Sequence, residues 1–316
     1  MPVETLGTPL LWAGFIAFVL AMLALDLGVF HRKAHDVSLK EAGAWSAVWI
    51  GLALVFNVGV YALFGTDRAV EFTTAYLIEK ALAVDNIFVF AVIFTAFAIP
   101  TAYQHRLLFW GVIGALVMRA GFIFAGGALL QHFHWVIYVF GGLLALTGVK
   151  LLVQRNDAVD IERNLGVRLF RKVFPVTNAL DGDKFVVVRN GKRFATPLLL
   201  ALVAIEVTDL IFALDSIPAI FAITSDPFIV FTSNIFAILG LRSMYFLLAG
   251  VMHKFAYLKV GLALILVFVG FKMLLMDIYK VPVGASLGVI AGLLTVSVLA
   301  SLMWPGAASE PQKKPH

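Results

Sequence analysis

Six acidic residues lie inside long apolar stretches of this sequence, where a carboxylate has little water around it. They are Asp26, Glu79, Asp85, Glu206, Asp209 and Asp215. A carboxylate at the centre of a bilayer costs at least about 2.5 kcal/mol on insertion scales, so these side chains should share a positive charge. Arg119 and Arg242 fall in the same kind of stretch and are the predicted counter-ions. Because two arginines cannot offset six acids, a net acidic cluster of oxygens should remain.

Such a cluster suits a hard divalent cation such as Mn²⁺, Mg²⁺ or Ca²⁺, which prefers oxygen ligands. The chain has no cysteine, and its histidines fall in loops or at the ends of apolar stretches, which disfavours a zinc site. The predicted metal ligands are Glu79, Asp85, Glu206, Asp209 and Asp215. Further candidates for the metal or a proton path are Asp26, Asn86 and Ser216. No prosthetic group and no enzymatic residue is predicted.

The acidic segments occur twice with the same spacing. EKALAVDNIF aligns with DLIFALDSIP, which pairs Glu79 with Asp209 and Asp85 with Asp215. Two further matches follow in the same order, GALVMRAGF with AILGLRSMYF and LTGVKLL with FVGFKML. Three matches in register predict an internal repeat. Any single acid could instead be the counter-ion of a basic residue, but the repeat favours a shared function for the paired acids.

Helix geometry limits which acids can meet. Glu206 and Asp209 are three residues apart and project from one helix face. Asp209 and Asp215 lie about 120° apart around an unbroken helix, since each residue turns about 100°. They could converge only if the helix is interrupted, and Pro218 is the candidate break because proline removes a backbone hydrogen bond. The basic Lys80 is expected to pair locally or to extend to the interface.

The elements that carry these residues are predicted to be membrane-spanning helices. The chain is 61% hydrophobic and 14% charged, with a mean hydropathy of +0.97, which is typical of a polytopic membrane protein. Runs of roughly 20 apolar residues, the length that crosses a bilayer, number about nine. They cover 10–30, 44–64, 72–99, 107–131, 135–153, 196–222, 228–252, 257–277 and 283–304. The predicted fold is all-α.

These spans divide the chain into two repeats with flanking helices. Two spans in 1–64 precede the first three-helix repeat at 65–153, and a connection at 154–195 leads to the second repeat at 196–277. A last span at 278–304 precedes a polar tail, 305–316, which is predicted to be disordered. Because three is an odd number, the two repeats run in opposite directions through the membrane. Inverted repeats with polar residues in paired helices are typical of secondary transporters.

The loop charges predict an orientation. Lysine and arginine gather in the loops on one side of the predicted membrane, and the other side holds only Arg68 and Lys280. The positive-inside rule therefore places the N-terminus outside and the C-terminus in the cytoplasm. Within the cytoplasmic connection, VDIERNLGVRLFRKVF is predicted to form a basic amphipathic helix and KFVVVRNGKRFAT a hairpin. This surface could contact lipid head groups or serve as a solvated linker.

The motifs resemble a known family. YLIEKALAVDNIFVF, EVTDLIFALDSIPAIFAITSDPFIV and NIFAILGLRSMYFLLAG are similar to the TerC family of integral membrane proteins, especially its Alx-type bacterial members. The likeness extends over nearly the whole chain. It implies a protein of the bacterial inner membrane that exports Mn²⁺, and a kinship with LysE-like transporters. The choice of Mn²⁺ comes from this resemblance, because spacing alone does not distinguish it from other hard cations.

Three functions stay open at this point. The favoured one is Mn²⁺ export, with exchange for protons expected because a metal and protons compete for the same carboxylates. The second is transport of Ca²⁺ or another small substrate, and the third is a membrane-protein scaffold or assembly factor. No phosphate-binding loop motif is present, so transport driven by ATP on this chain is not expected. The expected partners are Mn²⁺ and the bilayer, without nucleic acid, and no oligomeric state is predicted.

Overall fold

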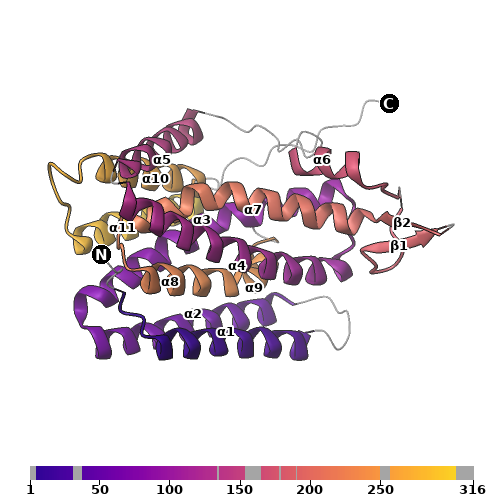
Figure 1. Ribbon diagram of the computed structural model, residues 1–316, viewed down its shortest axis with the longest axis horizontal. Helices are drawn as coiled ribbons and strands as arrows, with labels where there is room; N and C mark the ends of the chain where they lie inside the picture. The colour runs from indigo at the N-terminus through magenta and orange to yellow at the C-terminus, as the bar shows by residue number, and fades with distance from the viewer. Residues whose placement is uncertain are drawn as a thin grey trace.

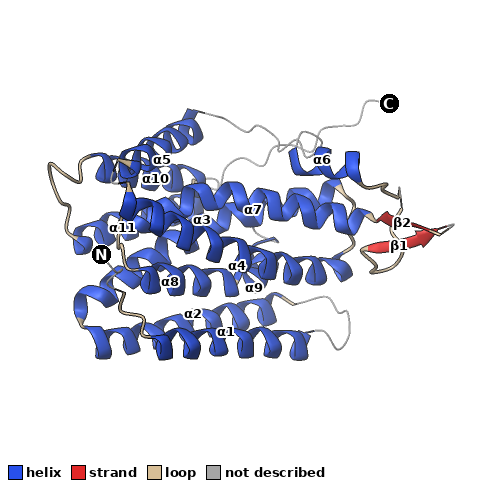
Figure 2. Cartoon of the chain, in the orientation of Figure 1, coloured by secondary structure: helices blue, strands red, loops and turns tan. Residues whose placement is uncertain are grey.

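The computed structural model describes residues 5–30, 38–133, 135–153, 165–177, 179–189, 191–249 and 257–303. Long helices run side by side along the longest axis of the molecule, and a strand pair lies at one end (Figures 1 and 2). The elements are α1 (Pro9–Phe30), α2 (Leu39–Phe64), α3 (Thr66–Ala96), α4 (Thr101–His132), α5 (Val136–Val153), α6 (Leu165–Val173), β1 (Val186–Arg189), β2 (Lys192–Ala195), α7 (Pro197–Phe221), α8 (Pro227–Leu239), α9 (Leu241–Ala249), α10 (Leu258–Leu274) and α11 (Val283–Met303).

Five helices are long and apolar enough to cross a membrane, namely α2, α4, α5, α7 and α11. The pair α8 and α9 adds a sixth if the two form one span, although they meet at an angle of 42°. These counts apply to the described residues. The all-helical membrane fold is thus confirmed, whereas the predicted number of nine spans stays a prediction.

Local signals explain where the helices begin. Ser38 caps α2 by accepting a hydrogen bond from the backbone of Glu41. Asp226 caps α8 in the same way, with Pro227 at the first helical position. Between α2 and α3, Gly65 adopts a φ of 86°, which a residue without Cβ reaches at little cost. That single residue separates two long helices.

The central helices pack in a reciprocal pattern. In the predicted repeat, α3 corresponds to α7, α4 to α8 with α9, and α5 to α10. The structure packs α3 against α8 and α9, and α7 against α4. It also packs α3 against α7 and α5 against α10. Contacts of one half therefore have counterparts in the other half.

The contact between α5 and α10 is also reciprocal, because equivalent residues of the two helices make the same close approach. A Cβ on Gly148 would lie 2.7 Å from the backbone oxygen of Ala263, and one on Gly270 would lie 2.7 Å from that of Gly141. In the predicted alignment Gly148 corresponds to Gly270, and Gly141 to Ala263. The two close approaches are thus equivalent positions, and glycine lets the backbones meet.

The connection contains the predicted hairpin. β1 and β2 pair antiparallel, with Val186 opposite Ala195, and Gly191 in the turn has a φ of 74°. The short helix α6 lies within the predicted amphipathic segment, and residues 154–164 lie outside the described part of the chain. Arg106 of α4 forms an ion pair with Asp183 and lies over the ring of Phe185. The hairpin therefore contacts the beginning of α4.

The structure corrects one expectation about helix continuity and adds a break that the sequence did not predict. α7 runs unbroken through Asp215 and ends at Phe221, so Pro218 in its last turns does not interrupt the helix near the acids. The span predicted at 228–252 is instead divided, because α8 ends at Leu239 and α9 begins after Gly240. Pro218 lacks the hydrogen bond to the carbonyl of Leu214, but the chain keeps helical geometry past it to Phe221.

Candidate functional site

A buried ion-pair cluster lies near the middle of α3 and α7. Arg119 of α4 donates from Nε to Oδ2 of Asp209 at 3.1 Å and from Nη2 to Oδ1 at 2.9 Å. Its Nη1 donates to Glu79 Oε1 and lies 3.4 Å from Ser216 Oγ. Glu79, Arg119 and Asp209 are 0, 1 and 2% exposed. One predicted counter-ion thus joins the two acids that the repeat makes equivalent.

The periodicity of the helices explains how these residues meet. Glu79 and Asn86 are seven residues apart on α3, and Asp209 and Ser216 are seven apart on α7. Seven residues make nearly two turns, so each pair lies on one face of its helix. Asn86 donates from Nδ2 to Asp209 Oδ1 at 3.1 Å, which joins the two faces directly. Asn86 and Ser216 are equivalent positions in the predicted repeat.

The cluster contains buried oxygens without a hydrogen-bond donor. Glu79 Oε2 and Asn86 Oδ1 have no partner within the described residues, and Asn86 is 1% exposed. Leaving a buried polar atom unpaired typically costs about 1–3 kcal/mol. Both atoms are acceptors on one face of α3, so they are available to a cation that enters the cluster.

Glu206 lies beside the cluster without joining its hydrogen bonds. It is three residues before Asp209 on α7, and its carboxylate rests on Gly114 of α4. A Cβ at Gly114 would lie 2.1 Å from Oε1, so only glycine makes room there. Oε2 of Glu206 is buried and unpaired among the described residues. Gly114 was not among the residues predicted to form the site, although its position five residues before Arg119 in an apolar stretch could have indicated it.

Asp215 lies elsewhere. Its Oδ1 accepts a hydrogen bond from Thr147 of α5 at 3.2 Å, so this acid faces α5 while Asp209 faces α4. Within the described residues, no three His, Asp or Glu side chains are placed to hold a metal ion. The side chains of Asp85 on α3 and Asp26 on α1 lie outside the described part. The five-acid site therefore stays a prediction, with Glu79 and Asp209 as its assembled core.

A basic residue of α3, Lys80, lies at the bend between α8 and α9. Lys80 of α3 donates to the backbone oxygen of Ala237 at 3.2 Å, and a Cβ on Gly240 would lie 2.9 Å from its Nζ. A cation at a helix C-terminus interacts favourably with the helix dipole. The sequence predicted that Lys80 either pairs locally or extends to the interface. The structure shows local pairing. The second predicted counter-ion, Arg242, is buried on α9 just beyond the bend.

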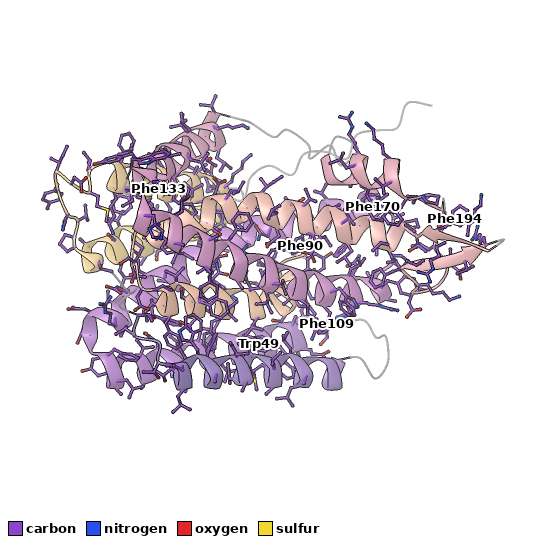
Figure 3. All side chains as sticks on the ribbon, in the orientation of Figure 1. Trp49, Phe90, Phe109, Phe133, Phe170 and Phe194 are labelled. Carbon is purple, nitrogen blue, oxygen red and sulfur yellow. The ribbon has the colours of Figure 1, made fainter. Side chains whose placement is uncertain are left out.

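The cluster is closed in this conformation. A cavity of about 10 Å³ adjoins Asp209, room for about one water molecule. It is lined by residues of α3, α4, α7 and α9, including Phe90, which Figure 3 labels in the middle of the bundle. Since the charged side chains are almost fully buried, an ion can reach them only after the helices move.

Comparison with known proteins gives close relatives along the whole chain. The chain is 62% identical over 299 residues to an "Uncharacterized membrane protein STKORF319" of Myxococcus xanthus, covering 95% of this chain and 94% of the relative. It is 49% identical over 305 residues to the "Putative membrane-bound redox modulator Alx" of Escherichia coli strain K12, covering 94% and 95%. A membrane protein of Rickettsia felis is 44% identical over 292 residues, covering 92% and 97%.

No solved structure matches the chain. The family model described as "Integral membrane protein TerC family" matches residues 64–308, which include α3 to α11 and hence every residue of the Arg119 cluster. This protein is therefore a member of the TerC family of integral membrane proteins.

Proposed function

We propose that this protein is a secondary transporter that exports Mn²⁺ across the bacterial inner membrane. The observation that carries the proposal is the meeting of Glu79 and Asp209 at Arg119, near the middle of two long helices. Buried oxygens beside them have no partner in the described part of the chain. A helix anchor alone would need one acid for one arginine. Two acids and one guanidinium carry a formal charge of about −1, which a further cation can offset.

The chemistry of the cluster favours a hard cation. Carboxylate, amide and hydroxyl oxygens from Glu79, Asp209, Asn86 and Ser216 are the ligands that Mn²⁺, Mg²⁺ and Ca²⁺ prefer. The likeness to TerC proteins supplies the choice of Mn²⁺ among them. Transport of Ca²⁺ or of another small substrate is the alternative within this class, and a membrane-protein scaffold is the alternative outside it.

The reciprocal packing of α3 to α5 with α7 to α10 supports inverted repeats and alternating access. Because the present arrangement is closed, each transport step requires the two halves to move relative to one another. The proposed orientation has the N-terminus outside and the C-terminus in the cytoplasm. The ion pair of Arg106 with Asp183 is consistent with it, since both residues belong to the predicted cytoplasmic side.

Cysteine labelling tests the orientation directly, because the natural chain has no cysteine. Lys192→Cys lies in the exposed hairpin at β2. An impermeant maleimide should label it in inverted membrane vesicles and leave it unlabelled in intact cells with a permeable outer membrane. Labelling of the intact cells would reverse the orientation.

The name of the Alx relatives refers to redox modulation. This chain has no cysteine and therefore cannot carry out thiol chemistry. Mn²⁺ is itself redox-active, so export of this ion would alter cellular redox balance without any electron transfer by the protein. Mn²⁺ export is therefore compatible with the redox role in the name of the Alx relatives.

Metal flux in proteoliposomes that contain only this protein is the decisive experiment. Wild-type protein should move Mn²⁺, Asp209→Asn should not, and Asp183→Asn should behave like wild type because Asp183 is an exposed carboxylate at the hairpin. Flux of Ca²⁺ in place of Mn²⁺ would establish the first alternative. Absence of any ion flux from well-folded wild-type protein would favour the scaffold.

We further propose that Mn²⁺ leaves in exchange for protons. Protons and metal would compete for the same oxygens, so binding of one displaces the other. A pH dye trapped in the vesicles should report opposing proton flux when Mn²⁺ is added without an imposed gradient. Full Mn²⁺ flux without a dye response would mean uniport or another counter-ion.

A further inference from the structure

We propose that Arg119 is a tethered cation that occupies the transport site in place of the metal, and that its guanidinium moves to Glu206 when the metal binds. This inference rests on the proposed Mn²⁺ transport through Glu79 and Asp209. It assigns the arginine an active part in the transport cycle, beyond that of a fixed counter-ion, and it makes Glu206 the acceptor of Arg119 in place of the metal ligand predicted from the sequence.

Arg119 uses the oxygens that a metal would need. Its two-pronged contact takes both oxygens of Asp209, and its third nitrogen takes Oε1 of Glu79. A divalent cation bound to the same oxygens would lie within a few ångströms of the guanidinium, in a site with almost no solvent to screen the repulsion. Metal and guanidinium therefore exclude one another from these carboxylates.

Glu206 is placed to receive the displaced guanidinium. It lies one helical turn before Asp209 on the same face of α7, and its buried Oε2 has no partner among the residues that the structure describes. Its carboxylate rests on Gly114 of α4, the helix that carries Arg119, at the point where the missing Cβ leaves room. An arginine side chain is long and flexible enough to move by one turn between two such acceptors.

The movement of Arg119 between the two sets of carboxylates would help the transporter to return after it has released its metal ion. An inverted-repeat transporter must return after releasing its ion, and any buried carboxylate that then carries neither a proton nor a cation opposes that step. With Arg119 on Glu79 and Asp209 the site keeps a cation during the return. With Arg119 on Glu206 the site is free for metal. The arginine is then required for net transport, whereas exchange of one bound metal for another never passes through the empty carrier.

The test compares these two transport modes in proteoliposomes that carry Arg119→Gln. We expect net Mn²⁺ efflux to fall at least about tenfold, the effect of a barrier higher by ~1.4 kcal/mol, while exchange of radioactive for unlabelled Mn²⁺ continues. Arg119→Lys keeps the charge and should restore part of the net efflux. Arg106→Gln is the matched control on the same helix, because its carboxylate partner lies at the hairpin, and it should retain both modes.

A second variant addresses the acceptor. Glu206→Gln removes the proposed second position of the guanidinium, so half-maximal exchange should require at least about tenfold more Mn²⁺. Net efflux by Arg119→Gln at the wild-type rate would overturn the inference. So would equal loss of both modes in a variant that stays monodisperse, or an unchanged Mn²⁺ requirement in Glu206→Gln. If wild-type protein moves Mn²⁺ in neither mode, the proposed function itself fails.

Discussion

The two predicted repeats place an arginine at equivalent positions, but the helices that carry it differ in shape. α4 runs unbroken from Thr101 to His132, and its Arg119 reaches the acids of α3 and α7. In the other half the equivalent segment is divided at Gly240 into α8 and α9, and Arg242 follows the bend. Similar sequence motifs therefore adopt different local structures.

This difference in shape matters because two halves of identical conformation would make a site between them equally open to both sides of the membrane. A straight α4 beside a bent α8 and α9 is what one conformation of an alternating-access cycle would contain. Lys80 stabilises the bent form of this segment, because it donates a hydrogen bond to a backbone oxygen at the end of α8. The following variants test how far the halves are equivalent.

The largest effect is expected from Asp209 and Asp215, two of the three acids of α7. Asp209→Asn removes one partner of a buried ion pair and should lower the free energy of unfolding by about 3–5 kcal/mol. Asp215→Asn replaces the charged oxygen that accepts from Thr147 by a neutral amide oxygen, and the weaker hydrogen bond should cost about 1 kcal/mol. Because the repeat pairs Asp215 with Asp85, we expect both variants to lose Mn²⁺ transport. Unfolding in detergent and flux in proteoliposomes measure the two properties.

Two outcomes would break this comparison. Normal transport by Asp215→Asn would rule out a site shared by both pairs of acids. Equal stability of the two variants would mean that the ion pair of Asp209 with Arg119 contributes little, and that the cluster does not hold α4 against α7.

An intermediate effect is expected where α5 meets α10. Gly148→Ala and Gly270→Ala each place a Cβ within 3 Å of backbone atoms, and overpacking of this kind costs about 1–3 kcal/mol. The losses in unfolding free energy should be similar, since the contacts are reciprocal. Gly142→Ala on α5 is the control, because its Cβ would meet nothing within 4 Å. Destabilisation by only one of the first two variants would show that the halves are not equivalent there.

The smallest effect is expected at the bend. Lys80→Met removes a cation from the C-terminal end of α8 and should cost about 0.3–1 kcal/mol. Gly240→Ala should displace the same ammonium group, because its Cβ would lie 2.9 Å from Nζ. The double variant should therefore cost clearly less than the sum of the two single variants in unfolding experiments. Strict additivity would mean that Gly240 and Lys80 act independently.

Much of the fold could be predicted from local patterns. The apolar runs correctly placed the long helices, because a helix that contacts lipid must be apolar over most of its length. The hairpin was predicted from β-branched residues around Asn190-Gly191, and its strands pair as expected. The bend at Gly240 was not predicted, because an isolated glycine is common in membrane helices and does not by itself end one.

The sequence by itself also determined which residue types are predicted to form the site and how Glu79 pairs with Asp209 in the predicted repeat, since residue type and spacing are local properties. Only the tertiary structure decided which arginine joins these acids and that Asp215 contacts Thr147 of α5 instead. The packing of both α3 and α4 against α7 and α8 makes that choice. The partner of a buried charge depends on which helices lie next to it, and helix neighbours are set by side-chain packing between segments far apart in the chain.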